Sequence, residues 1–176
     1  MSELYDQIVN QRGSVEGLIN RIPGFRGYMN RADRRAADRM LRDFIAGEIA
    51  DRIQRLTNIE KAILDGGGLM LMSKTKSAKT KIQTYQDRVK AAAPGYAGFF
   101  AAIKIDEEEL QRLYSFDEAQ IRYVDTFDEA LDQLDEAVKT QGDMETAVSN
   151  LDAVAVEAND AFNLREDVLT NLDKSL

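Results

Sequence analysis

Residues 106–140 read DEEELQRLYSFDEAQIRYVDTFDEALDQLDEAVKT, and residues 141–172 read QGDMETAVSNLDAVAVEANDAFNLREDVLTNL. In the first run, apolar residues return in heptad register: Leu110, Leu113, Val124, Phe127, Leu131, Leu134 and Val138. The second run has the same spacing: Met144, Ala147, Leu151, Val154, Ala158, Ala161, Val168 and Leu172. Such spacing forms one apolar stripe along an α-helix. The stretch therefore predicts two long helices that fold back on each other about the turn at residues 141–142.

Each apolar stripe is interrupted by one charged residue, Asp117 in the first and Arg165 in the second. In an antiparallel hairpin, the numbers of facing residues have a constant sum. The register that pairs Leu131 with Leu151 also places Asp117 opposite Arg165. A charge on an apolar stripe is costly unless it is paired, so this register predicts a partly buried ion pair that resists slippage of the hairpin. In the alternative, the stripe drifts at this point and Asp117 faces water.

The rest of the chain also predicts helices, over residues 2–22, 30–65 and 73–92, beside those at 106–140 and 143–175. The two prolines open similar phrases at 23–29 and 94–100, of the pattern Pro-Gly-aromatic-x-Gly-aromatic-apolar, and three glycines stand at 66–68. Proline and glycine interrupt helices, and no sustained alternation typical of strands occurs. We predict an all-α fold: an elongated antiparallel helical bundle of about five helices, with Pro-Gly-aromatic and Gly-rich turns between the long ones.

A single helical-bundle domain over residues 1–176 is expected. The two proline phrases suggest repeat units at 2–65 and 73–140, with an added helix at 143–175. No residue-by-residue repeat is seen outside the phrases, so an internal duplication rests on them alone. Long helices of this kind also lead us to expect self-association into a homo-oligomer.

The 176 residues include neither histidine nor cysteine. These are the usual proton shuttle, the readiest nucleophile and the common transition-metal ligands. We therefore expect no enzyme, no catalytic residue, no metal and no cofactor, and no small-molecule substrate is evident. The start of the chain does not resemble a signal peptide, and no apolar run is long enough for a membrane span, so a cytoplasmic location is expected.

Charge is divided unevenly along the chain. Residues 1–90 hold 17 Lys and Arg against 11 Asp and Glu, an excess of six positive charges, whereas residues 91–176 hold 6 against 20, an excess of fourteen negative charges. Halves that fold against each other would complement these charges, and we favour this interpretation over a basic docking surface. A sequence pI near 4.7 speaks against nucleic-acid binding.

Two segments are candidates for contact with a partner. The first is a group of arginines at the start of the helix over 30–65: Arg31, Arg34, Arg35, Arg39 and Arg42. Their spacing spreads them over one side of a helix, where they could hold phosphates or carboxylates. Aspartates lie between them, so a solvated face with ion pairs is the other interpretation.

The second candidate segment runs from Leu69 to Lys81. It joins an apolar tip to four lysines without an acidic residue: Leu69, Met70, Met72, Lys74, Lys76, Lys79 and Lys81. Such a segment could dock on an anionic membrane surface, or its apolar residues could cover the end of the core. From the whole chain, we expect a non-enzymatic scaffold or adaptor that mediates protein–protein interaction or self-assembly, with a peripheral membrane protein docking through Leu69–Lys81 as the alternative.

Overall fold

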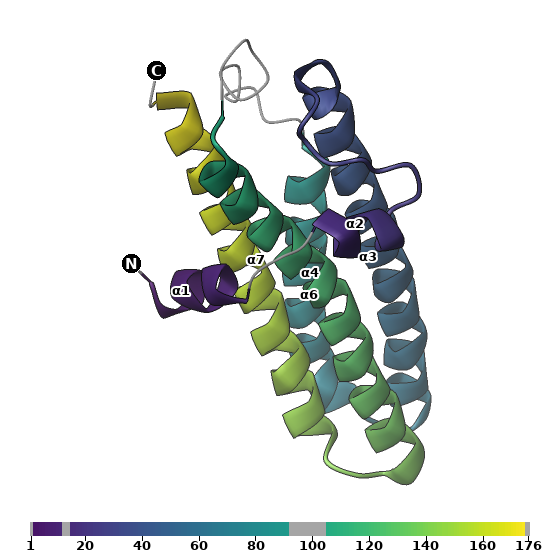
Figure 1. Cartoon of the computed structure of the whole chain (residues 1–176). Coiled ribbons are helices and arrows are strands. Elements are labelled where there is room, and N and C mark those ends of the chain that lie inside the picture. Colours follow the sequence, from purple (N-terminus) through teal and green to yellow (C-terminus); the bar gives the residue numbers. More distant parts are fainter. Residues whose placement is uncertain (1, 12–14, 92–104, 175–176) are drawn as a thin grey trace.

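The computed structural model describes residues 2–11, 15–91 and 105–174, and every regular element in them is helical (Figure 1). The elements follow one another as α1 (Glu3–Asn10), α2 (Val15–Arg21), the 3₁₀ turn η1 (Arg31–Asp33), α3 (Arg34–Asp65), the 3₁₀ turn η2 (Leu69–Leu71), α4 (Met72–Lys90), α6 (Glu107–Thr140) and α7 (Met144–Lys174). The predicted all-α bundle is confirmed. Six α-helices stand in the described residues where about five were expected, since the predicted segment 2–22 contains two short helices.

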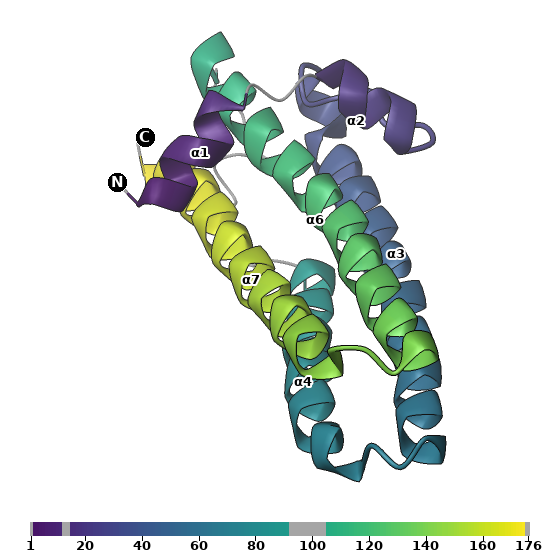
Figure 2. The same ribbon diagram turned by 90° about the horizontal axis from the view of Figure 1, so that it is seen from below.

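The four long helices pack as two hairpins, α3 with α4 and α6 with α7. Both hairpin turns lie at the same end of the bundle, away from the two chain termini (Figures 1 and 2). Each hairpin is antiparallel, but the hairpins associate through parallel neighbours: α3 lies beside α6, and α4 beside α7. The ion pairs Lys74–Glu145 and Lys81–Asp152 show that α4 and α7 run in the same direction, because the residue numbers increase along both helices from one pair to the next. None of the described helices is long and apolar enough to cross a bilayer.

The core is one cluster of apolar side chains from all the helices. Leu131 and Leu151, a predicted facing pair, are both fully buried. Hydrogen bonds on either side of this pair, from Tyr123 to Glu157 and from Asn150 to Gln133, run across the α6–α7 hairpin in the predicted register. The apolar stripes therefore lie where their spacing placed them. The side chain of Leu172 is outside the described part.

Local sequence signals set the ends of α6. Asp106 accepts a hydrogen bond from the Glu109 backbone N–H at 2.8 Å, and the Glu109 side chain accepts one from the Asp106 N–H at 3.2 Å. This capping box satisfies backbone donors that the first turn of a helix leaves free. At the other end Gln141, rather than Gly142, takes the left-handed conformation, with φ at 53°. The Gly142 N–H then closes the helix by donating to the Ala137 carbonyl at 2.8 Å.

The first proline phrase connects α2 to η1 and packs its two aromatic residues into the core. Phe25 and Tyr28 are buried, with their rings edge to face at 5.6 Å. Gly27 has a φ of +81°, and a Cβ there would lie 2.7 Å from the Tyr114 hydroxyl, so only glycine fits this turn. The phrase thus acts as an aromatic anchor as well as a helix break. The second phrase, at 94–100, lies outside the described residues, and the predicted duplication stays untested.

Candidate functional site

The turn between α3 and α4 carries Met70, the most exposed large apolar side chain of the described residues, and two further exposed apolar side chains; Met29, in the first proline phrase, is exposed to a similar degree, at 76%. Leu69 is 72% exposed and Met70 is 91% exposed, and Leu64 at the end of α3 is 44% exposed. We call these three residues the apolar tip. A Cβ at Gly68 would lie 2.6 Å from Ile63 Cγ2, so the chain can turn this closely only without a side chain there.

The predicted interaction candidates of this segment separate into two groups at the tip. Leu69 and Met70 project outward, whereas Leu71 and Met72 are partly buried and pack on the core. Met72 therefore serves as part of the bundle, as the core-covering interpretation of this segment supposed. Only the first two residues of the apolar run remain available to a partner.

Three of the four predicted lysines are held by carboxylates of neighbouring helices. Lys79 donates to Glu60 on α3 at 2.8 Å, and Lys81 donates to Asp152 on α7 at 2.6 Å. Lys74 pairs with Glu145, also on α7. Lys76 is exposed. The segment contains no acidic residue of its own, but its positive charge is largely compensated by acids distant in sequence.

The contacts between α4 and α7 form a ladder along this parallel pair of helices. The basic residues Lys74, Lys81 and Arg88 are seven residues apart, and Arg88 donates to the Asn159 side chain at 3.4 Å and to Glu166 at 2.9 Å. A seven-residue spacing keeps successive side chains at the same edge of a helix interface. Sequence reasoning did not identify this ladder, although the matching spacing of Glu145, Asp152 and Asn159 was a signal for it.

The predicted arginine group does not form one exposed face. Arg35 and Arg39 are exposed, but Arg34 is 5% exposed and donates from Nε to the Tyr28 carbonyl at 2.8 Å. The interpretation of Arg34 as a surface residue is wrong, because its position on α3 faces the aromatic anchor. Arg42 is also drawn inward, toward Asp38. The side chain of Arg31 is outside the described part.

Arg42 lies at the edge of a buried ionic network. Its Nε donates to Asp38 Oδ2 at 2.9 Å, and the other Asp38 oxygen accepts from Arg165 Nη2 at 2.8 Å. Arg165 Nε donates to Asp117 Oδ1 at 2.6 Å, and the Tyr28 hydroxyl donates to Asp117 Oδ2 at 2.7 Å. Asp117, Arg165 and Asp38 are each less than 4% exposed. The predicted contact between Asp117 and Arg165 is present, and Asp38 and Tyr28 extend it.

The network has two positive and two negative charges, and its ionisation follows from that balance. The carboxylates outweigh the effect of burial and raise the pKa of Arg165 well above its usual value, so the guanidinium stays charged. Burial acts against the charge of Asp38, but Arg165 and Arg42 outweigh it and lower the pKa of that carboxyl. Burial raises the pKa of Asp117, since Arg165 and Tyr28 offset only part of the cost.

The acidic face of α6 meets the basic first half of the chain. Asp125 accepts two hydrogen bonds from Arg21 on α2, at 2.9 and 2.7 Å. Farther along, Arg52 and Arg55 of α3 pair with Asp128. In residues 2–11, 15–91 and 105–174, no group of three or more acidic side chains is arranged to hold a metal ion. These carboxylates therefore bind helix to helix.

Comparisons with protein-family models, with curated proteins and with solved structures give no match to this chain.

Proposed function

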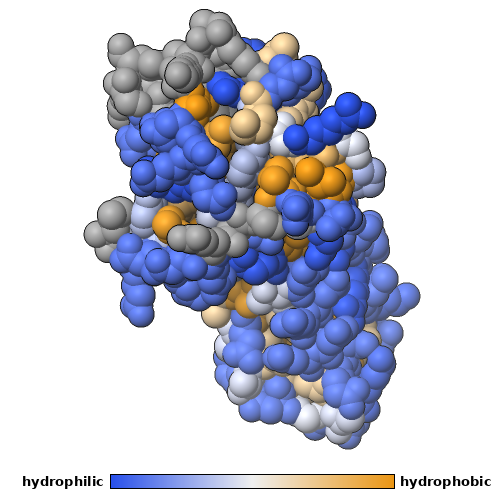
Figure 3. All heavy atoms as spheres, in the orientation of Figure 1, coloured by the Kyte–Doolittle hydropathy of each residue, from blue (hydrophilic) through white to orange (hydrophobic). Residues whose placement is uncertain are grey.

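We propose that this protein is a non-enzymatic helical scaffold or adaptor that binds a protein partner through the apolar tip. The observation that carries the proposal is the exposure of Leu64, Leu69 and Met70 at the end of a bundle stiffened by ion pairs between helices. Large apolar side chains gathered at one exposed place favour docking, because water solvates them poorly. On the face shown in Figure 3, hydrophilic residues cover most of the lower part of the bundle, toward the end where the hairpin turns lie, and the larger hydrophobic areas lie in the upper part.

The alternative, docking on an anionic membrane, is less favoured by the same segment. Attraction to anionic lipid requires lysines whose charge is free to face the surface. Lys74, Lys79 and Lys81 instead hold carboxylates of α7 and α3, which leaves Lys76 as the lysine of this segment without such a contact in the described residues. A protein partner needs no such excess of positive charge.

The proposal is tested by a double substitution, Leu69→Ser with Met70→Ser. Since both side chains are exposed, we expect an unchanged melting temperature. Affinity purification from extract of the source cells should recover a partner with the unsubstituted chain and lose it with this variant. Val156→Ser is a matched control, because Val156 is an exposed apolar residue on α7, away from the tip. If both variants still recover the partner, the apolar tip is not part of the interface.

Two further measurements separate the sources of binding. Sedimentation equilibrium of the purified chain distinguishes a second copy of the chain from a different partner. If the purified chain forms an oligomer and the tip substitutions dissociate it, the partner is a second copy of the chain. Co-sedimentation with anionic and neutral vesicles at two salt concentrations tests the membrane alternative. We expect no binding to either, whereas tip-dependent binding to anionic vesicles at low salt would replace the scaffold proposal by the alternative.

A further inference from the structure

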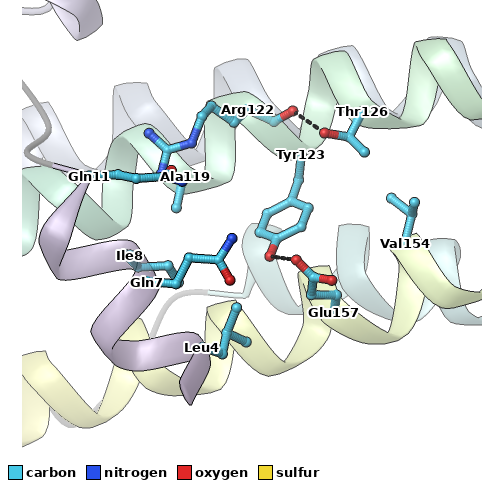
Figure 4. A pocket seen from close by; sticks show the side chains of 10 residues that line it. All are labelled: Leu4, Gln7, Ile8, Gln11, Ala119, Arg122, Tyr123, Thr126, Val154 and Glu157. Carbon is cyan, nitrogen blue, oxygen red and sulfur yellow. Dashed lines mark hydrogen bonds between the residues drawn. The ribbon is translucent and has the colours of Figure 1, made fainter. Parts of the chain in front are cut away.

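A cavity of about 240 Å³ lies between the short helix α1 and the hairpin of α6 and α7. Figure 4 shows its walls, to which three helices contribute. Its lining includes Leu4, Gln7 and Ile8 of α1, Tyr123 of α6, and Val154 and Glu157 of α7. We call this cavity the α1 cleft. It lies on a different part of the molecule from the apolar tip, since α1 is far from the hairpin turns (Figure 1).

The α1 cleft contains a carboxylate with a free oxygen. The Tyr123 hydroxyl donates to Glu157 Oε1 at 2.7 Å. Burial, reinforced by Glu157, raises the pKa of Tyr123, so the hydroxyl keeps its proton and acts as a donor. No hydrogen bond within the described part of the chain engages Oε2 of Glu157, and no Lys or Arg nitrogen there lies within 4.0 Å of this carboxylate. Glu157, whose residue is exposed at the α1 cleft, therefore has one oriented oxygen and one available oxygen, with no counter-ion among the described residues.

The surroundings of Glu157 add a second acceptor and an apolar wall. In Figure 4 the Gln7 carboxamide lies across the cleft, close in the view to Tyr123 and Glu157. Gln7 is exposed, and its side chain has no hydrogen-bond partner among the described residues, so its oxygen can accept from a ligand. Leu4, Ile8 and Val154 supply apolar surface. The cavity has room for about eight water molecules, enough for a small organic molecule.

The other charge of the α1 cleft is already compensated. Arg122 lines the cleft, but its guanidinium lies 3.9 Å from the Glu118 carboxylate, one turn earlier on α6. The charge that lacks an ionic partner in the cleft is thus negative. A carboxylate without a counter-ion gains most from a ligand that brings both a positive charge and hydrogen-bond donors.

We propose that the α1 cleft binds a small organic cation, a primary ammonium group attached to a short apolar chain or ring. The ammonium group donates to Glu157 Oε2 and to the Gln7 side-chain oxygen, and the apolar part packs against Leu4, Ile8 and Val154. The Tyr123 ring adds attraction, because the face of an aromatic ring is negative. Tyr123 also holds the Glu157 carboxylate in position.

Titration calorimetry with 2-phenylethylammonium chloride tests the proposal, with neutral 2-phenylethanol and anionic phenylacetate as comparison probes. We expect the ammonium compound to bind with a dissociation constant of about 1 mM or below, and the other two to bind more weakly. Glu157→Gln keeps an oxygen for the Tyr123 hydroxyl but removes the charge, and should weaken ammonium binding about tenfold. Asp160→Asn is the matched control, an exposed acid on α7 that does not line the cleft, and should leave the affinity unchanged.

Equal binding of the alcohol, preferred binding of phenylacetate, or full affinity in Glu157→Gln would overturn the proposal. If the Glu157→Gln variant does not fold, the proposal can still be tested on the unsubstituted chain. On titration with the ammonium compound, amide resonances of Gln7, Tyr123 and Glu157 should shift together, and unmoved resonances would also overturn the proposal. Because the purified chain is used, these results are independent of any partner at the apolar tip.

Discussion

At the scale of single residues, the buried charges of Asp38, Asp117 and Arg165, with the partly buried Arg42 at their edge, are the unusual feature of the core. Their contacts join α3, α6 and α7, and Tyr28 adds the segment before α3. The two stripes of the α6–α7 hairpin predicted the Asp117–Arg165 contact. The aspartates between the arginines of α3 suggested a solvated face, but one of them, Asp38, lies three residues before Leu41 and shares the buried side of α3.

Removal of Asp117 should show how strongly the network is coupled. We predict that Asp117→Leu lowers the free energy of unfolding by about 3–5 kcal/mol, because Arg165 loses one partner and Tyr28 loses its acceptor inside the core. Adding Arg165→Leu should cost less than the two single effects together, by about 1 kcal/mol or more, since the second change removes a charge already poorly paired. Urea denaturation of both single variants and the double variant measures this coupling.

The control for this cycle is a pair that does not touch, Asp117→Leu with Lys76→Ala. Its effects should be additive, because Lys76 is exposed on α4 and belongs to no part of the network. Additive effects of the Asp117 and Arg165 substitutions as well would mean that the contact does not hold the hairpin in register.

The lowered pKa of Asp38 gives the network a pH dependence of known sign. A carboxyl whose pKa is lower in the folded state stabilises the fold above its unfolded value, near 3.8, and this contribution is lost as the pH falls through the folded value. We predict that the stability difference between the unsubstituted chain and Asp38→Asn narrows steadily as the pH falls below about 4. Denaturation at a series of pH values measures it. If the difference in stability widened as the pH fell, the pKa of Asp38 would be raised in the folded state and not lowered.

At the scale of helices, the start of α6 and the end of α3 were predictable, whereas the division of residues 2–22 into α1 and α2 and the packing between hairpins were not. The capping box of Asp106 and Glu109, and the glycines after Asp65, act within a few residues of their helices, so the sequence shows them directly. The parallel contact of α4 with α7 depends on how one hairpin lies on the other. No stripe of a single helix contains that information, although paired seven-residue spacings on two helices indicate it once they are compared.

Exchange of one pair in the α4–α7 ladder tests this packing. Lys81→Glu places two acids together and should lower the free energy of unfolding by about 1 kcal/mol, a modest amount because both side chains are about a third exposed. Combining it with Asp152→Lys should restore most of the loss, since the pair is present again with its charges reversed. Thermal melts at low salt measure both effects, and Lys76→Glu serves as the control. Failure of the double variant to recover would argue against a direct contact.

At the scale of the whole molecule, the uneven charge of the two halves indicated that their charges complement each other, but it did not indicate which residues pair. The basic residues Arg21, Arg52 and Lys81 of the first half all meet aspartates of the second half. The α1 cleft was beyond prediction, because it forms where α1 packs against a hairpin more than 100 residues away in sequence. The apolar tip could be predicted from the sequence, since an apolar run directly after three glycines places its first residues at a turn.

Division of the chain between Lys90 and Ala91 separates a fragment with six excess positive charges from one with fourteen excess negative charges. We predict that the mixed fragments assemble into a helical complex, and that their association rate falls about tenfold or more between low salt and 0.5 M salt. Opposite net charges draw the fragments together over distances that salt screens, whereas the apolar core forms only after contact. Stopped-flow circular dichroism measures the rate. Arg52→Gln with Arg55→Gln in the first fragment should slow association at low salt and change it little at high salt. A rate independent of salt would mean that apolar collapse, and not charge, brings the two halves of this bundle together.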